Sequence, residues 1–261
     1  MGRFAAPPYN SRPLFINAPV AKACEAPAGI ARLVGVLGSS GHPCAVIDMN
    51  IEGMLWLLGR ARPGEDTWSS RAVKNIDRNI AALRDGKTYS NGDRYRRCVN
   101  DLNRALLAAS SGDARISLSD YEDRSLSPLR SSDLREAADH PEDNPFYEYF
   151  SERLRGAMRD ESPPFVGFSL TYLGQALTTF AMMGFVRAEY PSSKIILGGA
   201  LVTSWMGNAS RSVRFDGLVD HVVAGPGETF LLDLLGSEGE RPIGATYDYG
   251  PFPRNDYLAP G

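Results

Sequence analysis

The chain has 261 residues, 43% of them hydrophobic, and a formal net charge of −3. That length and composition suffice for a substantial buried core, and they lack the overall basic excess that is typical of nucleic-acid-binding proteins. Three widely spaced cysteines do not form a disulfide framework, and we find no signal-like segment and no long apolar span. We therefore expect a cytoplasmic protein without a nucleic-acid or membrane partner.

The first part of the chain has the pattern of a strand, a helix and a second strand. Residues 14–19 form a short apolar run that is typical of a buried strand. Residues 27–30 then open a helix whose apolar positions continue to Leu37. Gly41-His42 predicts a turn, and residues 44–48 predict the second strand, which ends at an aspartate.

Residues 51–161 are too many for an ordinary crossover between strands, so they predict an insertion with structure of its own. Apolar spacing favours helices at residues 54–58, 71–83 and 94–109. On the third helix we expect one buried face, formed by Tyr95, Val99, Leu102, Leu106 and Leu107. An aromatic cluster at residues 144–150 either covers a cofactor, contacts another domain or packs within the insertion.

Residues 165–170 and 194–197 predict two further strands, joined by a helix over residues 173–186. Hydroxyl side chains and glycines stand where these strands end. They are Ser169 and Thr171 after the first strand, and Gly198-Gly199 after the second. In a parallel sheet, ligands bind beyond the carboxyl ends of the strands, so these residues are candidates for a binding site. Glycines there let the backbone approach a flat ligand closely.

A third turn supports the same interpretation. Gly225, Gly227 and Glu228 follow the last predicted strand, near residues 220–224, and precede a helix over residues 229–235. Together these patterns predict a doubly wound α/β fold, with a five-stranded parallel sheet in flavodoxin-like (Rossmann-like) order and a mainly helical insertion. We expect residues 1–50 and 162–250 to form this domain around the insertion at 51–161.

The spacing of the motifs Ser-Leu-Thr, Gly-Gly and Gly-x-Gly-Glu resembles that in the N-terminal cobalamin (B12)-binding domain of B12-dependent radical SAM enzymes. The resemblance implies a methyltransferase-like enzyme in which this chain binds the nucleotide tail of cobalamin. It implies cofactor-binding roles for four segments, the loops at residues 17–20 and 169–172 and the turns at residues 198–200 and 225–228. The candidate residues are Asn17, Ala18, Pro19, Val20, Ser169, Leu170, Thr171, Tyr172, Gly198, Gly199, Ala200, Gly225, Gly227 and Glu228.

The sequence departs from related patterns in two ways. The loop after the first strand has no histidine, which implies that cobalamin binds base-off without a histidine lower ligand, and His42, His140 and His221 each suit ordinary turns or strand starts. The cluster motif Cys-x-x-x-Cys-x-x-Cys is also absent. We therefore expect no catalytic or metal-ligating residue in this chain.

Residues 251–261 are rich in proline and resemble a linker toward a C-terminal radical SAM domain, which would hold the iron-sulfur cluster and S-adenosylmethionine. The chain alone is then not catalytic. An alternative is a flavodoxin-like nucleotide-binding or interaction domain that binds no cobalamin. A stand-alone enzyme is a weaker alternative, because the sequence has no P-loop and no evident nucleophile and base.

Overall fold

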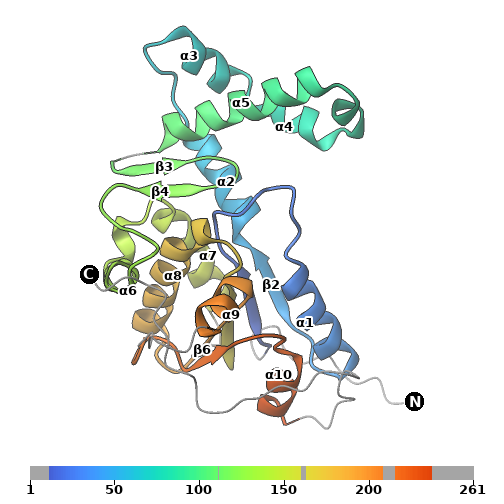
Figure 1. Cartoon of the computed structure of the whole chain (residues 1–261), viewed down its shortest axis with the longest axis vertical. Coiled ribbons are helices and arrows are strands. Elements are labelled where there is room, and N and C mark those ends of the chain that lie inside the picture. The colour runs from blue at the N-terminus through green and yellow to red at the C-terminus, as the bar shows by residue number, and fades with distance from the viewer. Residues whose placement is uncertain (1–11, 111, 160–162, 208–214, 237–261) are drawn as a thin grey trace.

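The computed structural model describes residues 12–110, 112–159, 163–207 and 215–236. Its main sheet has five parallel strands in the order β2-β1-β5-β6-β7 (Figure 1). This order is that of flavodoxin-like folds, so the predicted doubly wound α/β fold is confirmed. The predicted linker at residues 251–261 lies outside the described residues. The strands are Leu14–Asn17 (β1), Ala45–Asp48 (β2), Phe165–Ser169 (β5), Lys194–Gly198 (β6) and His221–Val223 (β7).

The two faces of this sheet have separate cores. On one face, Phe15, Ile196 and Val223 pack against α1 (Ala28–Ser39) and α10 (Glu228–Leu234). We call this the α1 face. The opposite face belongs to a larger buried cluster that contains Ile16, Val166 and Leu197. Burial on both faces explains why the strands are nearly continuous apolar runs in the sequence.

The helix α8 (Ala176–Glu189) covers the opposite face and is buried on all sides over its first eleven residues. Its other sides contact α6 (Ser131–Asp139) and α7 (Tyr147–Ala157). The α6 backbone comes so close that a Cβ on Gly184 would lie 1.8 Å from the carbonyl oxygen of Ala138. Two further helices contribute buried residues to the same cluster, α2 (Met49–Arg60) and α9 (Ala200–Met206).

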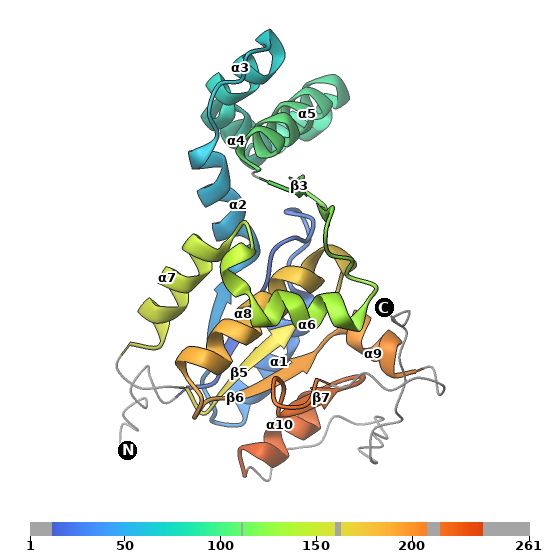
Figure 2. The ribbon, with the colours of Figure 1, turned by 90° about the vertical axis from the view of Figure 1, so that its left-hand side faces the viewer.

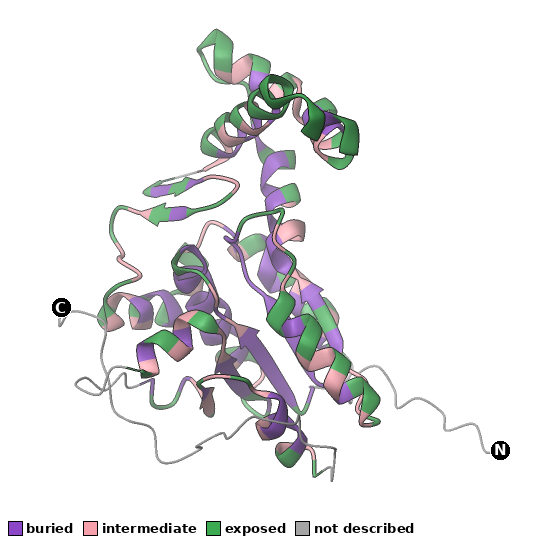
Figure 3. Ribbon diagram, turned by 45° about the vertical axis from the view of Figure 1, so that its right-hand side comes forward, coloured by how far each residue is buried: buried purple, intermediate pink, exposed green. Residues whose placement is uncertain are grey.

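The middle of the insertion projects away from the sheet. Its elements are α3 (Thr67–Lys74), α4 (Ile76–Arg84), a short 3₁₀ helix (Gly86–Ser90) and α5 (Gly92–Ala109). They leave from the end of α2, which itself starts directly after β2, so they lie beyond the carboxyl edge of the sheet (Figures 1 and 2). We call residues 62–109 the arm. Most residues of the arm are exposed (Figure 3).

Several local expectations need correction. The helix expected over residues 71–83 is broken at Asn75, which ends α3 and precedes α4. On α5, Tyr95 and Leu107 of the expected buried face are exposed, by 36% and 49%, whereas Cys98, which was not expected on that face, is buried. The helix expected from residue 173 begins as a 3₁₀ turn, Leu173–Gln175, before α8. An antiparallel hairpin, β3 (Ala114–Ile116) with β4 (Tyr121–Asp123), and the 3₁₀ turn Pro141–Asp143 were not predicted.

Candidate functional site

The α1 face contains a cavity of about 200 Å³ beside the carboxyl ends of β5, β6 and β7. Its apolar walls are formed by side chains of the sheet, α1 and α10, among them Phe15, Leu33, Ile196, Val223 and Leu231. Ser169 lies at its edge, at the end of β5. The cavity is therefore mostly apolar with a few polar groups, which is the usual character of a site for a small ligand.

Missing side chains create this cavity. Six of its lining residues are glycines, and four of these come from four different parts of the fold, Gly29 of α1, Gly167 of β5, Gly198 of β6 and Gly227 before α10. A Cβ at Gly29 would meet its nearest atom, the Ser169 hydroxyl oxygen, only at 3.9 Å. Side chains at Gly29, Gly198 and Gly227 would therefore project into the space or narrow it. At Gly167 the space is already taken, since a Cβ there would lie 2.8 Å from the Phe15 ring.

Glu228 is the polar group that stands out in this cavity. It is the first residue of α10 and only 2% exposed, and its Oε1 forms an ion pair with Nε of Arg32 on α1. Its Oε2 is buried and has no hydrogen-bond partner among the described residues. A buried acceptor without a partner is costly. Glu228 lines the cavity, but its Oε2 has almost no exposed surface, so a ligand with an N–H or O–H group reaches this acceptor only when the carboxylate turns toward the cavity.

Gly199 has a different role from the other glycines. Its φ is +115°, and a Cβ would lie 2.4 Å from the carbonyl oxygen of Leu170. The backbone of Leu170 accepts a hydrogen bond from Leu201 (3.2 Å) and donates one to Gly198 (2.7 Å). Gly199 is therefore required by the junction between the ends of β5 and β6, and its lack of a side chain is explained without a ligand.

The crevice between the ends of β1 and β5 is the topological switch point of this fold. Gln175 fills it. This side chain is 1% exposed and donates from Nε2 to the Asn17 side-chain oxygen (3.1 Å) and to the Ala18 carbonyl (2.8 Å). Its Oε1 accepts from the backbone nitrogens of Thr171 and Tyr172, both at 3.0 Å. We call this the Gln175 network.

The loop after β1 is held in further ways. Val20 donates its backbone N–H to the Gly174 carbonyl (3.1 Å), and Asn17 donates its side-chain amide to Asp48 (3.0 Å). At the surface, the Tyr172 hydroxyl contacts the Glu25 carboxylate, a contact that lowers the pKa of Glu25 and raises that of Tyr172. The polar groups of this crevice are thus satisfied within the protein.

The structure divides the fourteen residues that the sequence proposed. Six line the α1-face cavity, and eight do not. Those that do are Ser169, Gly198, Gly199, Gly225, Gly227 and Glu228. Asn17, Ala18, Pro19, Val20, Leu170, Thr171, Tyr172 and Ala200 lie outside it, the first four on the loop after β1 and the others around the ends of β5 and β6.

Sequence reasoning missed Arg32, Gly167 and Gln175. Gly167 interrupts an apolar strand, and an interior glycine is a recognised sign of close approach. Arg32 gave no signal, because only the packing of α1 beside α10 reveals its partner. Gln175, the only glutamine of the chain, resembled an ordinary helical residue.

The thiols lie in three different parts of the fold. Cys24 is exposed on the loop after β1, Cys44 is half-buried before β2, and Cys98 is buried in α5. Burial raises the pKa of the Cys44 thiol to about 11. Within the described ranges, no three His, Cys, Asp or Glu side chains come together as a metal-binding group.

The fold and cavity define the class of the molecule as a flavodoxin-like α/β domain with a ligand-sized cavity beside the carboxyl ends of its strands. Comparison with protein-family models, with curated proteins and with solved structures gave no match in any of the three. In the part of the chain that the structure describes, no helix is both long and apolar enough to cross a lipid bilayer.

Proposed function

We propose that this chain is the cobalamin-binding module of a B12-dependent radical SAM enzyme, and that the nucleotide tail of cobalamin occupies the α1-face cavity. The observation that carries the proposal is a slot with glycines in its walls that is also lined by Glu228, whose buried Oε2 has no hydrogen-bond partner among the described residues. An apolar group alone would leave this oxygen without a donor, so the ligand needs both a flat apolar part and a hydroxyl or amide.

The nucleotide tail meets these requirements. The cavity of about 200 Å³ is smaller than the roughly 300–1,000 Å³ of sites for whole drug-sized ligands, so it suits one bicyclic ring with its sugar edge. The benzimidazole would lie between the glycines, with the Ser169 hydroxyl donating to a ring nitrogen. A ribose hydroxyl would donate to Glu228, and the partly exposed Arg32 would face the phosphate.

Catalysis would belong to another domain. When bound, cobalamin supplies methyl-transfer chemistry at its cobalt atom, and cleavage of S-adenosylmethionine needs an iron-sulfur cluster held by grouped cysteines. Cys24, Cys44 and Cys98 are too scattered over the fold to serve as that group. We therefore assign both the cluster and S-adenosylmethionine to a separate radical SAM domain. Three free thiols also suit a cytoplasmic location.

The test is a titration with hydroxocobalamin, followed by desalting and a visible absorbance spectrum. We expect about one corrinoid per chain, and weaker binding of cobinamide, which lacks the nucleotide tail. Gly29→Leu should fill the slot and weaken hydroxocobalamin binding at least tenfold. Gly35→Leu is the matched control, because Gly35 lies on the same helix with open space around it.

A second variant addresses the polar requirement. Glu228→Leu removes the acceptor, which should weaken hydroxocobalamin binding by roughly five- to 150-fold, the equivalent of ~1–3 kcal/mol. Cobinamide binding should be unchanged. A desalted wild-type sample without corrinoid bands contradicts the proposal outright. If the wild type binds and neither Gly29→Leu nor Glu228→Leu changes the affinity, the ligand does not bind in this cavity.

A further inference from the structure

The arm has a charge opposite to that of the rest of the chain. Residues 62–109 contain ten Lys and Arg against six Asp and Glu, a net charge of +4, so the remaining residues together carry −7. All ten basic residues of the arm are exposed. Eight of the ten are arginines, whose planar guanidinium groups suit phosphate better than lysine does. The small net charge of the whole chain therefore conceals a segregated basic surface.

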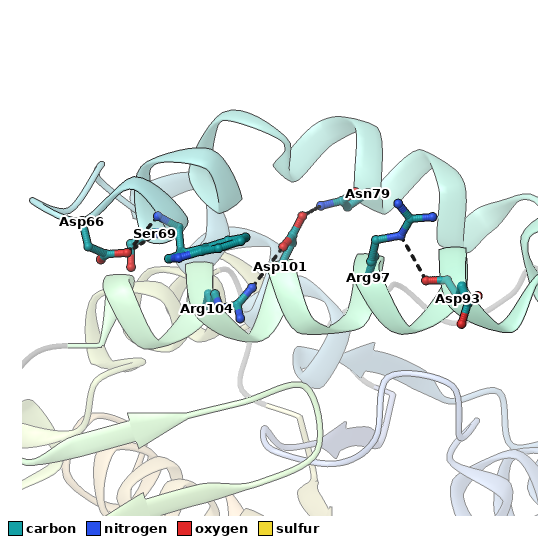
Figure 4. A network of polar contacts seen from close by, with 8 residues as sticks. Asp66, Ser69, Asn79, Asp93, Arg97, Asp101 and Arg104 are labelled. Carbon is teal, nitrogen blue, oxygen red and sulfur yellow. Dashed lines mark hydrogen bonds and ion pairs between the residues drawn. The ribbon is translucent and has the colours of Figure 1, made fainter.

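Most acidic residues of the arm are engaged in its own architecture. Asp66 caps α3 by accepting from the backbone nitrogens of Trp68 and Ser69, both at 2.9 Å. The Asp101 side chain, on α5, points toward α4 and lies within 3.5 Å of both the Asn79 amide and the Arg104 guanidinium (Figure 4). Asp85 and Asp93 likewise accept hydrogen bonds from the backbone of Lys87 and the side chain of Arg96.

Several cations remain available on the outside. Arg71 and Lys74 are one turn apart on α3, and Arg78 is in the first turn of α4. Among the described residues, none of these three forms an ion pair. Arg71 and Lys74 are three residues apart and so share one side of α3, which suits an extended polyanion, whose charges recur along its length.

Exposed aromatic rings accompany these cations. Trp68 on α3 is 62% exposed, and Tyr89, after α4, is 57% exposed, which is unusual for large rings without a partner to cover them. The Arg104 guanidinium lies 5.6 Å from the centre of the Trp68 ring. Tyr89 and Tyr95 form a tilted pair with ring centres 5.5 Å apart. Arginines beside exposed flat rings are the groups on which unpaired nucleobases stack.

A second cavity lies where the arm meets the body. It has a volume of about 400 Å³ and is lined by Tyr89, Tyr95 and apolar residues of α2, α4 and α5, with Lys22 and Cys24 on the body side. Arg84 lies at its arm side. We call it the foot cavity. An aromatic cavity with cations at its border suits a base that is turned away from the strand, with the phosphates remaining outside.

From these features we propose that the arm binds single-stranded nucleic acid, with phosphates along Arg71, Lys74 and Arg78, one base on Trp68 and another in the foot cavity. The inference is independent of the cobalamin proposal, because it uses no residue of the α1-face cavity. Duplex DNA fits less well, since its bases are stacked inside and cannot reach Trp68 or Tyr89. The negative body would repel the rest of the strand and keep it on the arm.

Fluorescence anisotropy with a 5′-fluorescein-labelled RNA 20-mer, the same sequence as single-stranded DNA and the corresponding DNA duplex tests the proposal. We expect both single strands to bind more tightly than the duplex. Comparing the RNA with the single-stranded DNA reveals whether affinity depends on the sugar. The triple variant Arg71→Gln, Lys74→Gln, Arg78→Gln should bind at least tenfold more weakly. It should also reduce the slope of log affinity against log salt by about 2, since each lost phosphate contact contributes about 0.7.

The matched control is Arg124→Gln, Arg159→Gln, Lys194→Gln, which removes the same charges from exposed positions of the body. Its affinity should stay within twofold of wild type. Trp68→Ala should cost roughly five- to 150-fold in affinity with an unchanged unfolding midpoint. If the control triple weakens binding as much as the arm triple, the arm is not the binding surface. If duplex, polyglutamate or phosphatidylserine vesicles bind as tightly as the single strands, or Trp68→Ala binds like wild type, the proposal is overturned.

Discussion

The α1-face cavity and the Gln175 crevice are neighbours at the carboxyl edge of one sheet, yet they differ in whether their buried polar groups have hydrogen-bond partners within the protein. In the crevice, one buried glutamine makes four hydrogen bonds and closes the switch point from within. In the cavity, glycines keep a space open and Glu228 retains an unpartnered oxygen. The sequence predicted binding residues in both regions for the same reason, because both follow buried strands.

The difference separates structural from ligand-binding candidates. A loop whose donors and acceptors are already paired gains little from a ligand, because binding would have to replace existing hydrogen bonds. A cavity lined by a residue with an unpaired acceptor gains a hydrogen bond without breaking one, once that side chain turns toward the ligand. Asn17, Ala18, Thr171 and Tyr172 belong to the first group, and Glu228 belongs to the second.

The largest expected effect is on the Gln175 network. Gln175→Leu should lower the free energy of unfolding by about 4 kcal/mol, because it leaves buried oxygen and nitrogen atoms of Asn17, Ala18 and Thr171 without a partner. Urea titration followed by circular dichroism measures the change. Thr179→Val is the control. It replaces a buried hydroxyl that has no partner among the described residues, and it should leave stability unchanged or slightly higher. A Gln175→Leu variant with normal stability that loses ligand binding would contradict a purely structural role.

A slightly smaller loss is expected at Gly199. Gly199→Ala combines a positive φ with a Cβ 2.4 Å from a backbone oxygen, so we expect a loss of about 3 kcal/mol in unfolding free energy. The backbone atoms of Leu170 cannot move away without breaking the junction between β5 and β6. Thermal and urea unfolding of the variant check this. A loss below about 0.5 kcal/mol would show that the junction tolerates a side chain.

The same substitution at Gly29 should have the opposite sign. Gly29 is helical and its Cβ would have open space, so Gly29→Ala should raise the unfolding free energy by about 0.5 kcal/mol. Its methyl group would nevertheless narrow the cavity. We therefore expect slightly higher stability together with slightly weaker hydroxocobalamin binding in a paired denaturation and titration experiment. Improved binding would contradict the position of the ligand.

The smallest expected effect concerns the thiols. With a pKa of about 11, Cys44 is almost entirely a neutral thiol at pH 8, with about 0.1% thiolate, whereas Cys24 is exposed. N-ethylmaleimide at pH 8 should therefore modify Cys24 first, as peptide mass spectrometry would reveal. The rate at Cys44 should rise about tenfold per pH unit until pH approaches 11. Labelling of Cys24, which lies on the loop beside the crevice, should leave hydroxocobalamin binding unchanged. Loss of binding after Cys24 is labelled would mean that the Gln175 crevice and the α1-face cavity form one site.

The sequence by itself determined the five strands of the main sheet, their parallel order and the glycine turns at their ends, but not the β3–β4 hairpin. These features depend on local apolar runs and on turn residues, which have the same meaning in most proteins. Residue 173 was nevertheless placed in a helix, although it begins a 3₁₀ turn, and Leu107 was placed on the buried face of α5. Both errors concern positions where contacts beyond the element decide the outcome.

Only the tertiary structure decided which candidates share a cavity. The pairing of Arg32 with Glu228, and the closure of the crevice by Gln175, join residues that are 196 and 158 positions apart in the chain. The tertiary structure also showed that ten exposed cations gather on one projecting arm, which the net charge of −3 for the whole chain had concealed. Composition averages over the whole chain, whereas binding depends on the few side chains that packing brings to the same place.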